Sequence, residues 1–141
     1  MVRYLLDENL TGKRAIEVLR AGGCDITTCH DLGLKGVRDD VWIPVAAKLG
    51  FVIITADVKM RRVPAEKAAI LAARARVVAV RIHGNITTVD VAQNIINSRR
   101  VLERFVRKQE APWMVTLALP SPKDFALGRA GRLTRHDLGK P

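Results

Sequence analysis

Short runs of apolar residues alternate along this chain with longer stretches in which apolar and polar positions follow a helical period. The apolar runs have the length and the branched residues of buried β-strands, and FVIITAD is the clearest. The expected strands are 3–7, 24–29, 51–57, 77–82 and 113–119. The expected helices are 11–22 with Thr11 as its N-cap, 39–50, 64–75, and one long helix at 87–108.

This repeated order of strand and helix predicts an α/β fold, a three-layer α/β/α sandwich around a mostly parallel sheet. We expect one domain of ordinary size over residues 1–119, with WMVTLAL as its last strand. Residues 120–141 are rich in Pro, Gly and Arg with little periodicity, which predicts a mobile, basic C-terminal tail. Ligand sites of parallel sheets lie at the carboxyl ends of the strands, so functional residues are expected at that edge.

Composition excludes several classes of protein. Of the 141 residues, 48% are hydrophobic, which argues against disorder. No apolar run is long enough to span a bilayer, no signal peptide is visible, and two cysteines are too few for a disulfide scaffold, so we expect a cytoplasmic protein outside the membrane. A zinc site is not expected, because Cys29 and His30 are adjacent and no fourth ligand has suitable spacing.

The net charge of +10 is unevenly distributed. Residues 1–66 carry nine acids against ten Lys and Arg, whereas residues 67–141 carry five acids against fourteen Lys and Arg. This pattern fits an acidic site beside a basic surface, and a basic surface attracts nucleic acids. The alternative is compositional, since sixteen Arg against eight Lys could simply be a solvated face of an Arg-rich chain.

Acidic residues follow two of the apolar strands. LLDENL and IITAD place Asp7 and Asp57 directly after strands, Asp39 begins the next helix in VRDDVWIP, and Glu66 lies in the first turn of another helix. These acids are expected to meet at the carboxyl edge of the sheet. Plain structural roles remain open, because Asp7 or Asn9 could cap a helix and Glu66 could complement a helix dipole.

Carboxylates that converge without bases between them repel one another, and some stay protonated unless a cation is present. Hard divalent ions with oxygen ligands, typically Mg²⁺ or Mn²⁺, resolve this repulsion. Such an ion can activate a water molecule and neutralise charge on a phosphodiester. An acidic metal site in a basic surround therefore indicates a metal-dependent nuclease.

The segments LLDENL, GVRDDVWI and FVIITADVKM, followed by Glu66, resemble the PIN-like family of small prokaryotic proteins. Within that family they are most similar to the branch of VapC-type toxins that begins with a LLDEN-type strand. The resemblance covers about residues 1–119. It implies a PIN fold, dependence on Mg²⁺ or Mn²⁺, and endoribonuclease activity on RNA. It also implies an antitoxin partner, as in type II toxin–antitoxin pairs, and a possible homodimer.

By position, the resemblance assigns the metal-binding and catalytic acids to Asp7, Asp39 and Asp57, and it assigns to Thr55 the hydroxyl that steadies the site through a hydrogen bond. The basic residues that we expect to bind RNA are Arg61, Arg62, Arg99, Arg100, Arg104 and Arg107.

The chain departs from the family pattern at the second acidic position, where a clear glutamate is missing. The doublet Asp39–Asp40 stands there, and Asp39 is preferred because it lies three residues before Trp42. Glu66 is the preferred fourth acid and metal ligand, with Glu8 as the alternative.

Two other classes fit parts of the pattern. In a response-regulator receiver, Asp57 would accept a phosphoryl group, but receivers also need a hydroxyl and a lysine at later strand ends, and VVAVRIHG and WMVTLAL offer neither. A catalytically idle PIN-like domain would keep the fold and the basic half and bind nucleic acid or a partner protein. Mg²⁺-dependent RNA cleavage by the purified protein separates the three.

Overall fold

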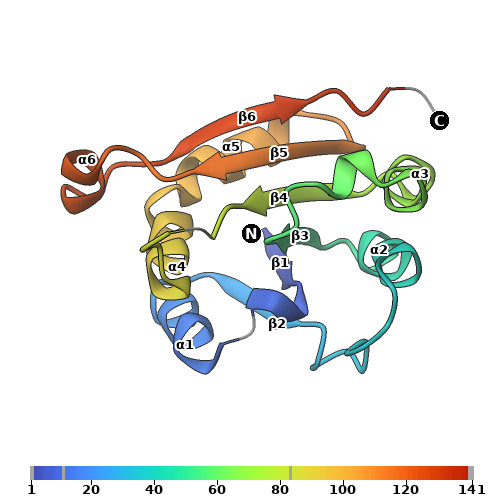
Figure 1. Cartoon of the computed structure of the whole chain (residues 1–141), viewed down its shortest axis with the longest axis horizontal. Coiled ribbons are helices and arrows are strands. Elements are labelled where there is room, and N and C mark those ends of the chain that lie inside the picture. The colour runs from blue at the N-terminus through green and yellow to red at the C-terminus, as the bar shows by residue number, and fades with distance from the viewer. Residues whose placement is uncertain (1, 11, 83, 140–141) are drawn as a thin grey trace.

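A six-stranded sheet runs through the centre of the molecule with the strand order β2-β1-β3-β4-β5-β6 (Figure 1). The computed structural model describes residues 2–10, 12–82 and 84–139, so the N-cap expected at Thr11 lies outside the described residues. β1 to β5 are parallel and β6 is antiparallel to β5, which confirms the prediction of a mostly parallel sheet. The strands are β1 (Arg3–Leu6), β2 (Asp25–Thr28), β3 (Val52–Thr55), β4 (Arg76–Val80), β5 (Trp113–Ala118) and β6 (Arg132–His136).

Helices cover both faces of the sheet, which confirms the three-layer α/β/α sandwich. The helices are α1 (Lys13–Ala21), α2 (Asp39–Lys48), α3 (Pro64–Ala73), α4 (Thr88–Asn97), α5 (Arg99–Lys108) and α6 (Pro122–Ala126), with 3₁₀ turns η1 (Glu8–Leu10) and η2 (Met60–Arg62). α1, α4 and α5 lie on one face, whereas α2 and α3 lie on the other (Figure 1). None of the helices in the described residues is long and apolar enough to cross a membrane.

The central strands are apolar on both faces because each face packs against helices. In β3, all four residues are buried. Ile53 joins Leu5 in the core beneath α2 and α3, whereas Ile54 joins Leu6 in the core beneath α1 and α4. Burying each of these side chains contributes about 1.5–3 kcal/mol, so the two cores hold the carboxyl ends of β1 and β3 firmly side by side.

The prediction of a single helix over residues 87–108 is wrong, because α4 and α5 are separate helices that meet at Ser98. The Ser98 backbone amide closes α4 on the Asn94 carbonyl at 2.9 Å. The Ser98 hydroxyl is fully buried and accepts a hydrogen bond from the Gly131 amide at 2.8 Å. The break could not be predicted for two reasons. The apolar period continues through it, because both helices pack against the same core, and Gly131, which bonds to the Ser98 hydroxyl, lies far along the chain.

The prediction that WMVTLAL is the last strand is also wrong. The chain beyond Pro120 forms α6 and then β6, which pairs with β5 from Ala118↔Arg132 to Met114↔His136. Leu138 is buried against the core beneath α2 and α3. β6 was not recognisable from its sequence RLTRH, because an edge strand with polar side chains lacks the apolar pattern of a core strand. The division of the chain at residue 119 stays a prediction.

Replacing Leu138 with alanine tests how firmly the C-terminal segment holds the domain. Because Leu138 is 6% exposed, we expect Leu138→Ala to lower the free energy of unfolding by about 2–5 kcal/mol in urea denaturation. Leu127, which is 61% exposed, supplies the matched control, and Leu127→Ala should change stability by less than about 0.5 kcal/mol. If Leu138→Ala, Leu127→Ala and a chain ending at Leu119 were all as stable as the wild type, residues 1–119 would fold without this segment.

Candidate metal centre

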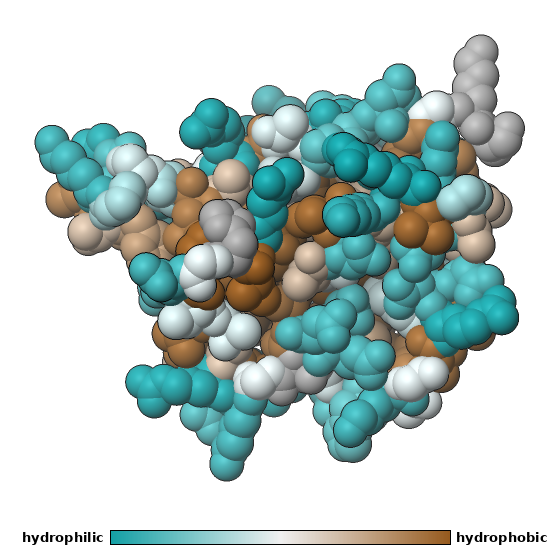
Figure 2. Space-filling model, viewed as in Figure 1, coloured by the Kyte–Doolittle hydropathy of each residue, from teal (hydrophilic) through white to brown (hydrophobic). Residues whose placement is uncertain are grey.

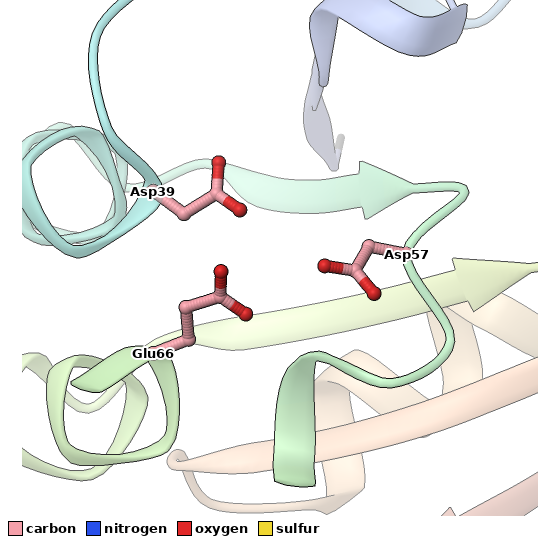
Figure 3. Close-up of side chains that lie close together, drawn as sticks. All are labelled: Asp39, Asp57 and Glu66. Atoms are coloured by element: carbon pink, nitrogen blue, oxygen red, sulfur yellow. The ribbon is translucent and has the colours of Figure 1, made fainter. Parts of the chain in front are cut away.

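Three acidic side chains from three separate elements point toward one another at the carboxyl edge of the sheet (Figure 3). Asp39 is the first residue of α2, Asp57 follows β3, and Glu66 lies in the first turn of α3. One carboxylate oxygen of each lies within 4.8 Å of the others. The parallel topology causes this convergence, because strand carboxyl ends and the N-termini of the following helices share one edge.

Hydrogen bonds fix the orientation of the two aspartates. Asp39 Oδ1 accepts a hydrogen bond from the indole Nε1 of buried Trp42 at 2.8 Å. Asp57 Oδ1 accepts one from the Lys59 amide at 3.0 Å. One oxygen of each carboxylate is thus held by the protein in a fixed orientation.

Glu66 is the member of the cluster whose charge is least satisfied. Its Oε2 atom is buried without a hydrogen-bond partner in the described part of the chain. Burial, a shared hydrogen bond with Asp39, and the negative charges of Asp39 and Asp57 raise the pKa of Glu66 to about 7. This buried carboxylate oxygen, which accepts no hydrogen bond from the described residues, faces two further carboxylates. Together the three carboxylates provide the oxygen ligands that a hard divalent cation such as Mg²⁺ or Mn²⁺ prefers.

Asp7 lies beside this cluster, at the end of β1, but is not one of the three converging acids. The Thr55 hydroxyl donates a hydrogen bond to Asp7 Oδ2 at 2.7 Å and accepts one from the Asp57 amide at 3.0 Å. Burial raises the pKa of Asp7 although the bond from Thr55 lowers it, and the negative charge of Asp39 adds to the rise. Thr55 therefore links two of the predicted site residues, while the role of Asp7 as a metal ligand stays a prediction.

The alternative acids lie elsewhere. Asp40 Oδ2 pairs with the Arg38 guanidinium at 2.6 Å, and the Arg38 hydrogen bond lowers the pKa of Asp40. Glu8 is exposed, and its Oε2 accepts a hydrogen bond from the Gly36 amide at 3.3 Å. In the described residues, neither belongs to the converging group, so the geometry favours Asp39 over Asp40 and Glu66 over Glu8.

The arginines predicted to bind RNA fall into two separate regions. Arg61 and Arg62, on η2, line a groove that starts beside Asp57. Arg99 donates to the Gly22 carbonyl oxygen at 2.5 Å and so anchors α5 on the end of α1. The remaining three are exposed on α5, on the opposite face of the sheet from η2: Arg100, Arg104 and Arg107.

Arg107 lies far from the acids along the strands. It lines a cavity with Arg3 and Arg76, which begin β1 and β4, so it belongs to the amino edge of the sheet. The sequence prediction missed Arg81, which directly follows β4 at the carboxyl edge and lines the groove with Arg61. Its position after a strand, equivalent to that of Asp57 after β3, was a signal that could have identified it.

A doubly wound sheet with clustered carboxylates at its carboxyl edge forms a donor set that can hold a divalent metal ion. Sequence comparison matches residues 2–81 to the family described as PIN like domain. The chain belongs to the PIN-like domain family, whose members are commonly metal-dependent nucleases. No curated protein and no solved structure matches the chain.

The metal-free protein is expected to lose stability as pH rises. The pKa of Glu66 is about 7 in the folded state against a usual value of 4.5, so the folded protein binds more protons than the unfolded chain between these values. The contribution of Glu66 is therefore fully present below pH 4.5 and is lost as pH rises through about 7. Urea denaturation in EDTA from pH 4.5 to 8 measures this slope.

Glu66→Gln should flatten that pH dependence, whereas the same change at exposed Glu17 should leave it as in the wild type. Added Mg²⁺ should raise the melting temperature more at pH 8 than at pH 5.5, because binding to a protonated carboxyl must displace its proton. A wild-type slope in Glu66→Gln would show that Glu66 is not buried against the two aspartates.

Proposed function

We propose that this protein is a Mg²⁺- or Mn²⁺-dependent endoribonuclease. The observation that carries the proposal is the convergence of Asp39, Asp57 and Glu66 within 4.8 Å, with the Glu66 Oε2 atom buried and without a hydrogen-bond partner among the described residues. Membership of the PIN-like family supports a nuclease, and the resemblance of LLDENL and ITADVKM to VapC-type toxins supports RNA as the substrate.

The three carboxylates would hold the ion. A bound Mg²⁺ or Mn²⁺ supplies Lewis-acid activation of water and neutralises charge that develops on a phosphodiester. Trp42 and the Lys59 amide orient the carboxylates of Asp39 and Asp57 before any ligand arrives. Asp7 and Thr55 keep β1 and β3 in register at the site, because their hydrogen bond joins the two strand ends. Such preorganisation lowers the cost of placing the reacting groups.

The proposal extends to the toxin of a type II toxin–antitoxin pair. A protein partner is supported by a row of exposed apolar residues, Val41 and Val45 of α2 and its C-cap Leu49, which repeat every four residues and so share one side of the helix. Because Asp39 begins the same helix, a protein bound there would lie next to the acids. Co-expression with a candidate antitoxin tests the pairing, and Val45→Asp should abolish copurification.

The main alternative is a PIN-like protein that binds nucleic acid or a partner without cleaving RNA. It would share the fold and the basic surface, so only turnover separates it from a nuclease. The receiver alternative has less support, because β5 ends at Ala118 and runs into Pro120 without a lysine, and because Glu66 joins the site from α3.

Removal of single acids tests the proposed activity. In an assay with mixed single-stranded RNA and Mg²⁺ or Mn²⁺, we expect Asp39→Asn and Asp57→Asn each to reduce cleavage by more than about a hundredfold, because each loses a carboxylate that the ion needs. Asp40→Asn, which only loses the pair with Arg38, should retain most activity. Chelation with EDTA should stop cleavage by the wild type.

Full activity in both Asp39→Asn and Asp57→Asn would exclude this cluster as the catalytic centre. A wild-type protein that is folded, binds Mg²⁺ and leaves all RNA intact would instead support the idle PIN-like alternative.

A further inference from the structure

A groove of about 300 Å³ opens beside the acid cluster. Ala56 and Val58, the two neighbours of Asp57, form its near end. Its basic lining residues come from the segment after β3 and from the residue after β4: Lys59, Arg61, Arg62 and Arg81. An extended ligand whose reacting bond lies at the acids would therefore pass directly onto four cationic side chains.

The positive charge of this groove is not neutralised by the protein itself. Within the described part of the chain, none of the four cations forms an ion pair with a carboxylate. Lys59, Arg62 and Arg81 are exposed, so their charges face the solvent. Uncompensated cations around a concave surface form a binding site for a polyanion.

Strand β6 extends this basic region over the sheet. Because side chains alternate along a strand, Arg132, Thr134 and His136 share one face, and the His136 Nε2 atom lies 2.6 Å from the Thr116 Oγ1 atom. Burial lowers the pKa of His136, and the charges of Arg61, Arg62 and Arg81 lower it further. Figure 2 shows hydrophilic side chains, with apolar ones between them, over strands β5 and β6.

Among the described residues that line the groove, none has an aromatic side chain on which a base could stack. Exposed large apolar side chains in the described residues are Val, Leu and Ile, and none is aromatic. The two tryptophans are buried in the cores. Without aromatic platforms, binding depends on contacts with phosphates, which position a nucleic acid but carry no sequence information.

We propose that the groove lined by Lys59, Arg61, Arg62 and Arg81, continued by the β6 face, holds the sugar–phosphate backbone of an RNA strand beside the acid cluster without selecting its bases. This proposal rests on the proposed function, because it names how that same site takes its substrate. It also assigns a role in substrate binding to Arg81 and to β6, which lie at or beyond the end of the segment matched to the PIN-like family.

The test is a salt titration of RNA binding by the full chain, measured by fluorescence anisotropy in EDTA so that no metal-dependent cleavage occurs. Oligo(U) and oligo(A) of equal length are the probes. For single strands, each lost phosphate contact should reduce the slope of log K against log salt by about 0.7, so Arg81→Gln and Arg62→Gln should each show that loss. Lys108→Gln, which removes one charge at the exposed end of α5, is the control and should keep the wild-type slope.

We expect oligo(U) and oligo(A) to bind with affinities within about threefold of each other, because the described lining of the groove offers cations for phosphates and no aromatic side chain for bases. A wild-type slope in both groove variants, an equal loss in Lys108→Gln, or a larger preference for one probe would overturn the proposal. If RNA binds through the groove but is not cleaved in Mg²⁺, the proposed nuclease function is contradicted and the groove proposal stands. If the wild type cleaves RNA but the groove variants bind RNA as the wild type does, the groove proposal is contradicted and the nuclease function stands.

Discussion

The mutual repulsion of three carboxylates is the constraint on which the rest of this structure depends. Asp39, Asp57 and Glu66 lie within 4.8 Å of one another, and without a cation such a group is stable only if some of its charge is removed or compensated. Two compensations are visible. Glu66 keeps its proton up to about neutral pH, and the N-termini of α2 and α3, where Asp39 and Glu66 lie, carry partial positive charge. A divalent cation would satisfy all three acids at once.

The sheet and its two cores keep the three acids close together despite this repulsion. Each acid is attached to a different element, and those elements are fixed by two apolar cores on opposite faces of the sheet. Between β1 and β3, the Asp7 amide donates to the Ile54 carbonyl oxygen at 2.9 Å, and the Thr55 hydroxyl donates to the Asp7 carboxylate. Because Thr55 is fully buried and also accepts from the Asp57 amide, the site cannot open without breaking hydrogen bonds that water does not replace.

Charge is also separated in space. The carboxyl edge holds the acids and, next to them, the basic groove of Arg61, Arg62 and Arg81. The amino edge has its own basic cavity at Arg3, Arg76 and Arg107, and the acid Glu103 also lines it. A negative site surrounded by positive charge attracts a polyanion to the vicinity of the acids while the acids repel its phosphates unless a cation intervenes. Metal binding and substrate binding are therefore expected to depend on each other.

The sequence by itself determined the layers and the position of the acids, because strongly apolar strands such as VIIT must be buried on both faces and parallel strands bring their carboxyl ends to one edge. It therefore indicated Asp7, Asp39, Asp57 and Glu66, with Asp40 and Glu8 as alternatives. Only the tertiary structure decided that Asp40 pairs with Arg38, that Asp7 accepts a hydrogen bond from Thr55, and that α4 and α5 separate at Ser98. It alone also revealed β6 and its contribution to the basic region, since a polar edge strand is defined by its backbone pairing with β5 and not by any pattern of its own side chains.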